Sequence, residues 1–313
     1  MFTSLNNQVH VDWDEIEIIL VHPYAKYKFD MKAYPELRPY FKAYYSKNTT
    51  YGAIKQFGLE VAQGEYVLFL MPNNILYSMT ALIDVLGKCT ENSAQDCIFY
   101  SVGDCLNIDP EINEIVSNNS LNSLEGKIFK KDYLIDNNIS FIETVSSGED
   151  LYFLQKLLNS HPQYSIDNSV LALQVFPTFS SVPMEEQYLN TVQMLSLANT
   201  ENVIAVNNVA MDKIIIMLVQ IYESLYSYDH VEYRRVVKNH IKNFILGLQN
   251  LININAIFSK CLEYSERYDN DSIIALNNDM SFYDFVVSIF VDETASNHEE
   301  DLAIEAYTEE EQE

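Results

Sequence analysis

The sequence predicts an α/β protein with a mainly parallel sheet and a C-terminal helical unit. Up to about residue 182, short apolar segments of strand type alternate with segments whose apolar residues recur every three or four positions, which is typical of strands alternating with helices. Beyond residue 182 only the helical period continues. We therefore expect an α/β domain over residues 1–182, a helical region over 183–296 and a disordered acidic tail over 297–313.

The elements follow from local patterns along the chain. Asn48-Thr49-Thr50 supplies N-cap chemistry for a helix whose apolar face carries Ile54 and Phe57, and Gly64 is placed to stop it. The expected strands are residues 15–21, 40–45, 66–70, 97–101 and 170–176. The other expected helices are residues 78–86, 150–158, 184–198, 209–228, 231–251, 258–268 and 282–290.

Charge and composition exclude several functions. The chain has 19 Lys and Arg against 45 Asp and Glu, a net charge of −26, so it has no basic surface for nucleic acid or anionic membranes. The apolar run 214–219 is far shorter than the roughly 20 residues of a membrane helix. There is no signal-peptide pattern, and the four cysteines have neither metal-knuckle nor disulfide spacing. These features predict a cytoplasmic protein without membrane insertion.

Several blocks, in order, resemble the inverting family 2 glycosyltransferases of the GT-A (Rossmann-like) fold. They include NTTYGAIKQFGL at 48–59, GEYVLFL at 64–70 and GEDLYF at 148–153. Residues 16–21 and 126–141 extend the resemblance, which covers roughly residues 4–180. It implies transfer of a sugar from a nucleotide sugar to an acceptor hydroxyl. It also implies a divalent metal, held by an Asp-x-Asp motif at the end of the strand at 66–70.

The resembled metal motif is replaced in this chain. Met71 and Asn73 stand at the positions of its two carboxylates. Because a thioether does not bind a hard cation and an amide is a poor substitute for a carboxylate, we expect no metal cofactor. Asn73, Asn74 and His22, at a second strand end, are candidate nucleotide contacts. The alternative is that the asparagines are turn residues after Pro72 and that His22 is structural.

Asp150 is the candidate catalytic base, with Glu149 beside it. The resemblance implies that Asp150 accepts the proton of the acceptor hydroxyl. The alternative is that both acids open a helix, where they favour the helix dipole and where Ser147 and Asp150 have capping-box spacing. Lys55-Gln56 stands where the family usually has Arg-Asn.

The resemblance implies that the first strand of the family's fold is missing from this sequence. Residues 4–8 resemble the end of the helix that follows this strand in the family. Because that strand is central, its two neighbours need other partners. The sheet could pair its strands differently, another protein could add a strand, or the true start could lie upstream of Met1.

Three functions are compatible with these features. The leading one is a non-catalytic glycosyltransferase-like subunit, whose partner is another protein, an active glycosyltransferase or a second copy, and which could still bind a nucleotide sugar. The second is an active metal-independent glycosyltransferase, and the third is an acidic interaction protein that reuses the fold. The apolar residues of the C-terminal helices either form a partner interface or cover the sheet: Ile214, Leu218, Ile221, Leu225, Phe244, Ile245 and Leu248.

Overall fold

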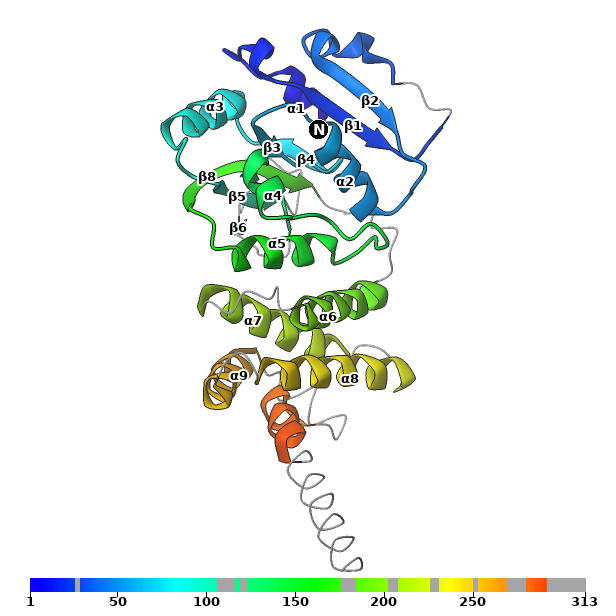
Figure 1. Cartoon of the computed structure of the whole chain (residues 1–313), viewed down its shortest axis with the longest axis vertical. Helices are drawn as coiled ribbons and strands as arrows, with labels where there is room; N and C mark the ends of the chain where they lie inside the picture. Colours follow the sequence, from blue (N-terminus) through cyan, green and yellow to red (C-terminus); the bar gives the residue numbers. More distant parts are fainter. Residues whose placement is uncertain are drawn as a thin grey trace, which may run out of the picture. The chain divides into compact units, whose positions relative to one another are not determined.

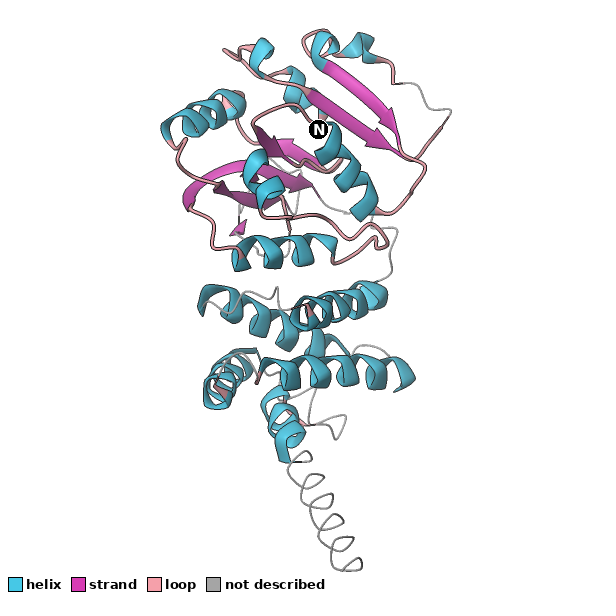
Figure 2. Ribbon diagram, viewed as in Figure 1, coloured by secondary structure: helices cyan, strands magenta, loops and turns pink. Residues whose placement is uncertain are grey.

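The chain folds into two compact units, Met1–Gln187 and Tyr188–Glu313. The computed structural model describes residues 1–25, 29–105, 116–118, 123–175, 184–201, 208–225, 231–249, 253–268 and 280–291. Figures 1 and 2 show strands and helices in the first unit and helices in the second. The acidic tail predicted over 297–313 lies outside the described residues.

The first unit alternates helices and strands along the sequence, as expected for an α/β domain. Its strands are β1 (Ile18–His22), β2 (Phe41–Tyr45), β3 (Tyr66–Leu68), β4 (Asn74–Leu76), β5 (Cys97–Cys105), β6 (Val116–Asn118), β7 (Lys127–Lys130) and β8 (Tyr164–Val175). Its helices are α1 (Phe2–Asn6), α2 (Tyr51–Val61), α3 (Ala81–Glu91), α4 (Lys131–Asp136) and α5 (Glu149–Asn159), with single 3-10 turns at Trp13–Glu15, Met31–Ala33 and Arg38–Tyr40.

The strands form two sheets of different kinds. β1 and β2 pair in parallel as a two-stranded sheet, and the other strands form a six-stranded sheet in the order β3-β7-β5-β8-β4, with β6 on β5. Among the described strand pairs of the larger sheet, β5 and β8 are the one parallel pair. The predicted α/β class is confirmed, but the mainly parallel strand direction is wrong. The short strands β4 and β7 were not predicted from the sequence. β7 lies between β3 and β5 and runs antiparallel to both.

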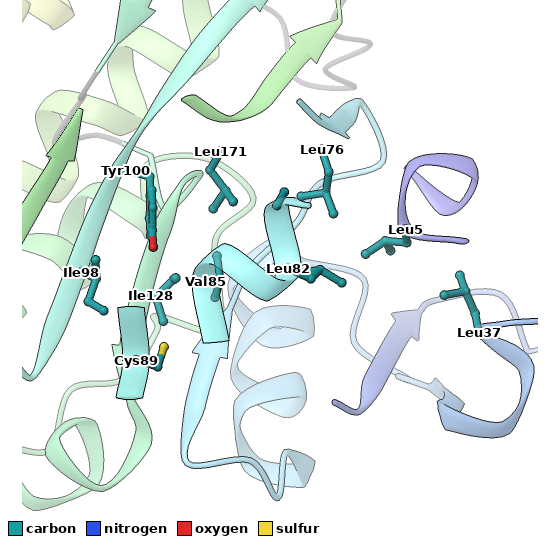
Figure 3. Packing of buried hydrophobic residues seen from close by; sticks show 11 residues of the cluster. Leu5, Leu37, Leu76, Leu82, Val85, Cys89, Ile98, Tyr100, Ile128 and Leu171 are labelled. Atoms are coloured by element: carbon teal, nitrogen blue, oxygen red, sulfur yellow. The ribbon is translucent and has the colours of Figure 1, made fainter. Parts of the chain in front are cut away.

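Two apolar cores hold the first unit together. One contains Leu82 and Val85 of α3, Ile98 and Tyr100 of β5, and Leu5 from the N-terminus (Figure 3). The other is a cluster of four aromatic rings, from the residue directly after β3, from β7, from α5 and from the segment before α5. Its closest pair, Phe141 and Phe153, stacks at 4.4 Å between centroids, and Phe69 and Phe129 complete it. This aromatic cluster fixes α5 against the end of β3.

Of the helix-boundary signals predicted from the sequence, the one at Thr50 is confirmed and those at Gly64 and Ser147 are wrong. Thr50 caps α2 as predicted, because its Oγ1 atom accepts a hydrogen bond from Ala53 N. Gly64 does not stop α2, which ends at Val61, and its N–H instead donates to Glu17. The capping box predicted at Ser147 does not form. Gly148, with φ +80°, precedes α5 without a side-chain cap, since glycine adopts this left-handed conformation without a steric penalty.

The second unit is helical throughout its described residues. It contains most of α6 (Met184–Thr200), α7 (Asn208–Ser224), α8 (Val231–Leu248), α9 (Ile254–Tyr268) and a helix over 282–291. None of the described helices combines the length and apolar character needed to cross a bilayer. Tyr222 is fully buried, its hydroxyl donates to Met280 O at 2.9 Å, and its ring packs on Phe282 and Phe285.

Burial corrects the interface expectation for the C-terminal helices. The seven apolar residues expected to form an interface or to cover the sheet are all 2% exposed or less. Side chains buried to this extent are core residues, because a partner can only contact surface that is accessible in the free chain. The cysteines Cys89, Cys97 and Cys261 are likewise free and buried, as expected for small core residues.

Candidate functional site

The chain turns back immediately after β3, at Met71–Asn74, and Asn74 closes this turn. Its side chain is buried, its Oδ1 atom accepts from Met71 N at 2.6 Å, and its own N–H donates to Met71 O at 2.9 Å. Its Nδ2 atom donates to Glu125 Oε1 at 3.0 Å. Asn74 therefore closes the turn through its side chain and backbone, and Asn73 beside it is half-buried.

These residues do not fit a divalent metal. Met71 offers a thioether, and both polar ends of the Asn74 amide are already hydrogen-bonded within the protein. Glu125 is bonded through its second oxygen to Ser123 Oγ at 3.2 Å. Among the described residues, no group of three or more His, Cys, Asp or Glu side chains is arranged to hold a metal ion. The turn after β3 thus lacks the hard, negatively charged oxygen ligands that Mg²⁺ or Mn²⁺ requires.

Lys55 of α2 joins the two predicted catalytic carboxylates at the start of α5. Its Nζ atom donates to Glu149 Oε1 at 2.8 Å and also to Asp150 Oδ1. The other Asp150 oxygen, Oδ2, accepts from Leu124 N at 3.3 Å. Both oxygens of the candidate base are therefore bound to donors of the protein itself.

Burial and charge determine the protonation of this cluster. Burial disfavours the ammonium of Lys55, but the carboxylates of Asp150 and Glu149 outweigh it, and the pKa of Lys55 lies above its usual range. Burial also raises the pKa of Glu149, and the neighbouring charge of Asp150 adds to this shift, against the attraction of Lys55. The cluster is a buried, charge-paired junction between α2 and α5.

A close backbone approach places Lys55 opposite α5. The segment before α5 docks on the start of α2, where Gly52 N donates to Val145 O at 3.1 Å and Thr50 Oγ1 donates to Glu143 O. A Cβ atom on Gly52 would lie 1.9 Å from Ile142 O, so only glycine permits this contact. Lys55 follows one helical turn later and faces the first turn of α5.

Lys127 is a buried cation that sequence analysis did not identify. Lys127 lies on β7, and the residue is 1% exposed. Its Nζ atom donates to Ser123 O at 2.6 Å and to Glu125 O at 3.5 Å. The same atom lies 5.9 Å from the centre of the Phe99 ring. Burial lowers the pKa of Lys127 to about 8. Its one sequence signal is a lysine within the apolar segment GKIF, directly after Gly126.

His22 has a structural environment at the end of β1. It is buried, its Nδ1 atom accepts from Tyr24 N at 3.3 Å, and its ring lies edge-on to Phe29 at 5.6 Å.

An open pocket of about 400 Å³ is formed by α2, α4 and the segment after α4, and none of the predicted site residues lines it. Its lining residues are Gln56, Leu59, Glu60, Lys131, Leu134, Ile135, Asn138, Ile139 and Ser140.

The α/β architecture of the first unit is that of the GT-A glycosyltransferase fold. Solved structures agree. S. aureus TarS 1–349 with UDP-GlcNAc matches at a TM-score of 0.56 and 17% identity, over 79% of this chain and 76% of that one. The structure of the same protein with UDP matches at a TM-score of 0.58 and 16% identity, over 95% of this chain and 87% of that one. No family model matches the sequence, and no curated protein does. At these identities the likeness shows the fold alone.

Proposed function

We propose that the chain is a non-catalytic glycosyltransferase-like subunit, which uses the GT-A fold for binding or assembly. The observation that carries this proposal is the turn at Met71–Asn74. It replaces the carboxylates of the resembled metal motif and uses Asn74 to close on itself. Without a cation at this place, charge on a leaving nucleotide diphosphate would not be offset.

The state of Asp150 supports the same proposal. A general base needs a carboxylate oxygen within reach of the hydroxyl proton it removes. Here one oxygen of Asp150 is paired with Lys55 and the other accepts from Leu124 N. A substrate hydroxyl would have to compete with an ammonium and a backbone N–H for the same oxygens.

An active metal-independent glycosyltransferase is the second candidate. It is favoured by Lys55 and Lys127, two buried ammonium groups whose positive charges both act on Asp150. Cations near a leaving diphosphate could replace a metal. Against this, each ammonium already donates to acceptors of the protein, Lys55 to carboxylates and Lys127 to Ser123 O. The strongly negative chain would also repel a nucleotide diphosphate.

The test pairs equilibrium binding with turnover. UDP-GlcNAc is the first probe, because TarS binds it, followed by other nucleotide sugars, each with Mn²⁺ present. Release of UDP is followed over hours at micromolar protein. Binding without release supports the non-catalytic subunit. Sustained release that disappears in Asp150→Asn overturns it and favours the active enzyme. If no nucleotide sugar binds, the chain is an interaction protein that reuses the fold.

A designed variant provides the control for the metal. Met71→Asp combined with Asn73→Asp restores the two carboxylates of the resembled motif. Because carboxylates are the ligands that Mn²⁺ prefers, this variant is expected to bind Mn²⁺ more tightly than the unmodified chain. Gln163→Glu combined with Asn168→Asp, at two exposed positions, leaves the turn residues unchanged and adds the same two negative charges, so it controls for the change in overall charge.

A further inference from the structure

β1 and β3 each have one edge without a strand partner in the described part of the chain, as do β2, β4 and β6. β1 pairs with β2 on one side only, and β3 ends the six-stranded sheet next to β7. An isolated two-stranded sheet is marginally stable, and parallel strands are normally enclosed by neighbours. We name these two open edges the β1/β3 edge pair.

The β1/β3 edge pair borders one shared core. Ile18 of β1 and Leu68 of β3 pack against the same apolar cluster, and Figure 1 shows β1 between β2 and β3. Just before these strands, Glu17 Oε1 accepts from Gly64 N at 2.9 Å and from Gln63 N. Neighbouring strands lie about 4.8 Å apart and join backbone to backbone. Here a glutamate side chain makes the connection instead.

Helices cover both faces of the small sheet beside these edges. Phe41 and Tyr44 of β2 point to opposite faces, because they are separated by an odd number of positions. Phe41 packs against Phe2 of α1, with ring centres 5.7 Å apart, and Tyr44 packs against Phe57 of α2 at 5.9 Å. A strand added to β1 would therefore meet apolar helices on both sides.

Burial shows where apolar surface is still open. Residues Ile18–Val21 of β1 and Tyr66–Leu68 of β3 are all only half-buried. By contrast, Cys97 and Ile98 of β5, which has strands on both sides, are 1% exposed. The half-buried apolar side chains and the unpaired backbone groups thus lie on the same strands.

We propose that the β1/β3 edge pair binds one extended, apolar strand of a partner protein, flanked by basic residues. An extended backbone is the group that satisfies open strand edges, and apolar side chains on both of its faces match the covering helices. Exposed Asp12 and Glu15 precede β1, and the chain carries a net charge of −26. A second copy would bring the same charge, so a basic partner is favoured. This inference rests on the proposed subunit role and specifies its partner.

A synthetic peptide tests the proposal without relying on a variant that may not fold. The fluorescent probe carries alternating Val and Ile over five positions, the length of β1, between two Lys pairs. Its control has the same side chains and charge but N-methylated backbone at alternate positions, which removes hydrogen-bond donors. Binding is measured by anisotropy with the full chain. The control is expected to bind about tenfold more weakly or worse, because several backbone hydrogen bonds are lost.

Hydrogen exchange locates the bound peptide. The amides of β1 and β3 should gain protection, while those of β5 and β8, already paired on both sides, should not change. Glu15→Lys should weaken binding several-fold, and more so at low salt. Asp136→Lys, an exposed acid on α4, is the matched control and should bind like the unmodified chain.

Several results would overturn the proposal. One is equal binding of the N-methylated control, and another is an absence of peptide binding. Protection, before the peptide is added, of the β1 and β3 amides that point away from β2 and β7 would show that these edges are already closed. Protection of the same amides that grows with chain concentration would assign the edges to a second copy. None of these results depends on nucleotide-sugar binding or turnover, so failure here is distinguishable from failure of the non-catalytic assignment.

Discussion

The Nζ atom of Lys55 donates a hydrogen bond to Oδ1 of Asp150, and this bond joins α2 to the start of α5. The two residues are 95 positions apart in the sequence. Asp150 is the residue that the family resemblance assigns as catalytic base, and here it is part of a buried ion cluster with Glu149. The following predictions separate the structural role of this cluster from a chemical one.

Lys55→Met should strongly destabilise the chain. The change leaves Glu149 and Asp150 without their shared cation in a buried setting, and breaking such a cluster on one side costs about 3–5 kcal/mol. Chemical denaturation measures the free energy of unfolding. The matched control is Lys42→Met, whose pair with Glu17 is exposed, with 46% of the lysine side chain accessible. It should change stability by about 1 kcal/mol or less. Equal effects in both variants would refute the structural role of the cluster.

Gly52→Ala and Gly87→Ala should have opposite effects on stability. A Cβ atom on Gly52 would lie 1.9 Å from Ile142 O, so the segment before α5 must move away from α2. We expect a loss of roughly 2 kcal/mol or more, as for other strained backbone sites. Gly87, within α3, has open space at the Cβ position, and its replacement should stabilise by about 0.5–1 kcal/mol. Thermal and denaturant unfolding of both variants test this contrast, and a tolerated alanine at 52 would contradict it.

Lys127 should make stability depend on pH in an identifiable window. Its pKa is about 8 in the folded chain, against about 10.4 in an unfolded one. Between these values the unfolded chain binds more protons, so stability rises with pH, whereas below pH 8 the full penalty of the buried charge is present. From pH 7 to 10 the unmodified chain should gain on the order of 2 kcal/mol relative to Lys127→Met. If the free energy of unfolding changes with pH by the same amount in both proteins, Lys127 is not buried as a cation.

Asp150→Asn tests the acid directly. Any residual UDP release should fall by roughly 100-fold, the effect of losing a general base. The same change should lower the free energy of unfolding. In either orientation the asparagine NH₂ group, a donor, would face another donor, Lys55 Nζ or Leu124 N, and one hydrogen bond would be lost. Asp132→Asn, on exposed α4, is the control. If release is measurable and unchanged in Asp150→Asn, Asp150 is a structural residue only.

Local patterns predicted much of the first unit. The signal at Thr50 located the start of α2, and α5 begins at Glu149, one residue before its predicted start. β4 and β7 were missed because three- and four-residue strands carry too little periodicity. The strand predicted over 170–176 begins at Tyr164, since pairing with β5 extends it through a polar stretch with a register shift.

The site was only partly accessible from the sequence. Glu149 and Asp150 were identified by resemblance, but their partner Lys55 is more than 90 positions away, and no local pattern reports a contact at that separation. The capping box at Ser147 failed because Gly148 takes the left-handed conformation at the start of α5. Burial of Lys127 could not be read from its neighbours, because lysines in strands usually extend to solvent.

Calorimetric titration of UDP-GlcNAc into the full chain, with and without Mn²⁺, tests the central claim most directly. The claim is that the turn at Met71–Asn74 holds no metal, since Asn74 is committed to Met71 N and to Glu125. The account predicts that Mn²⁺ leaves the affinity for UDP-GlcNAc unchanged. A gain in affinity of tenfold or more on adding Mn²⁺, about 1.4 kcal/mol, would contradict it.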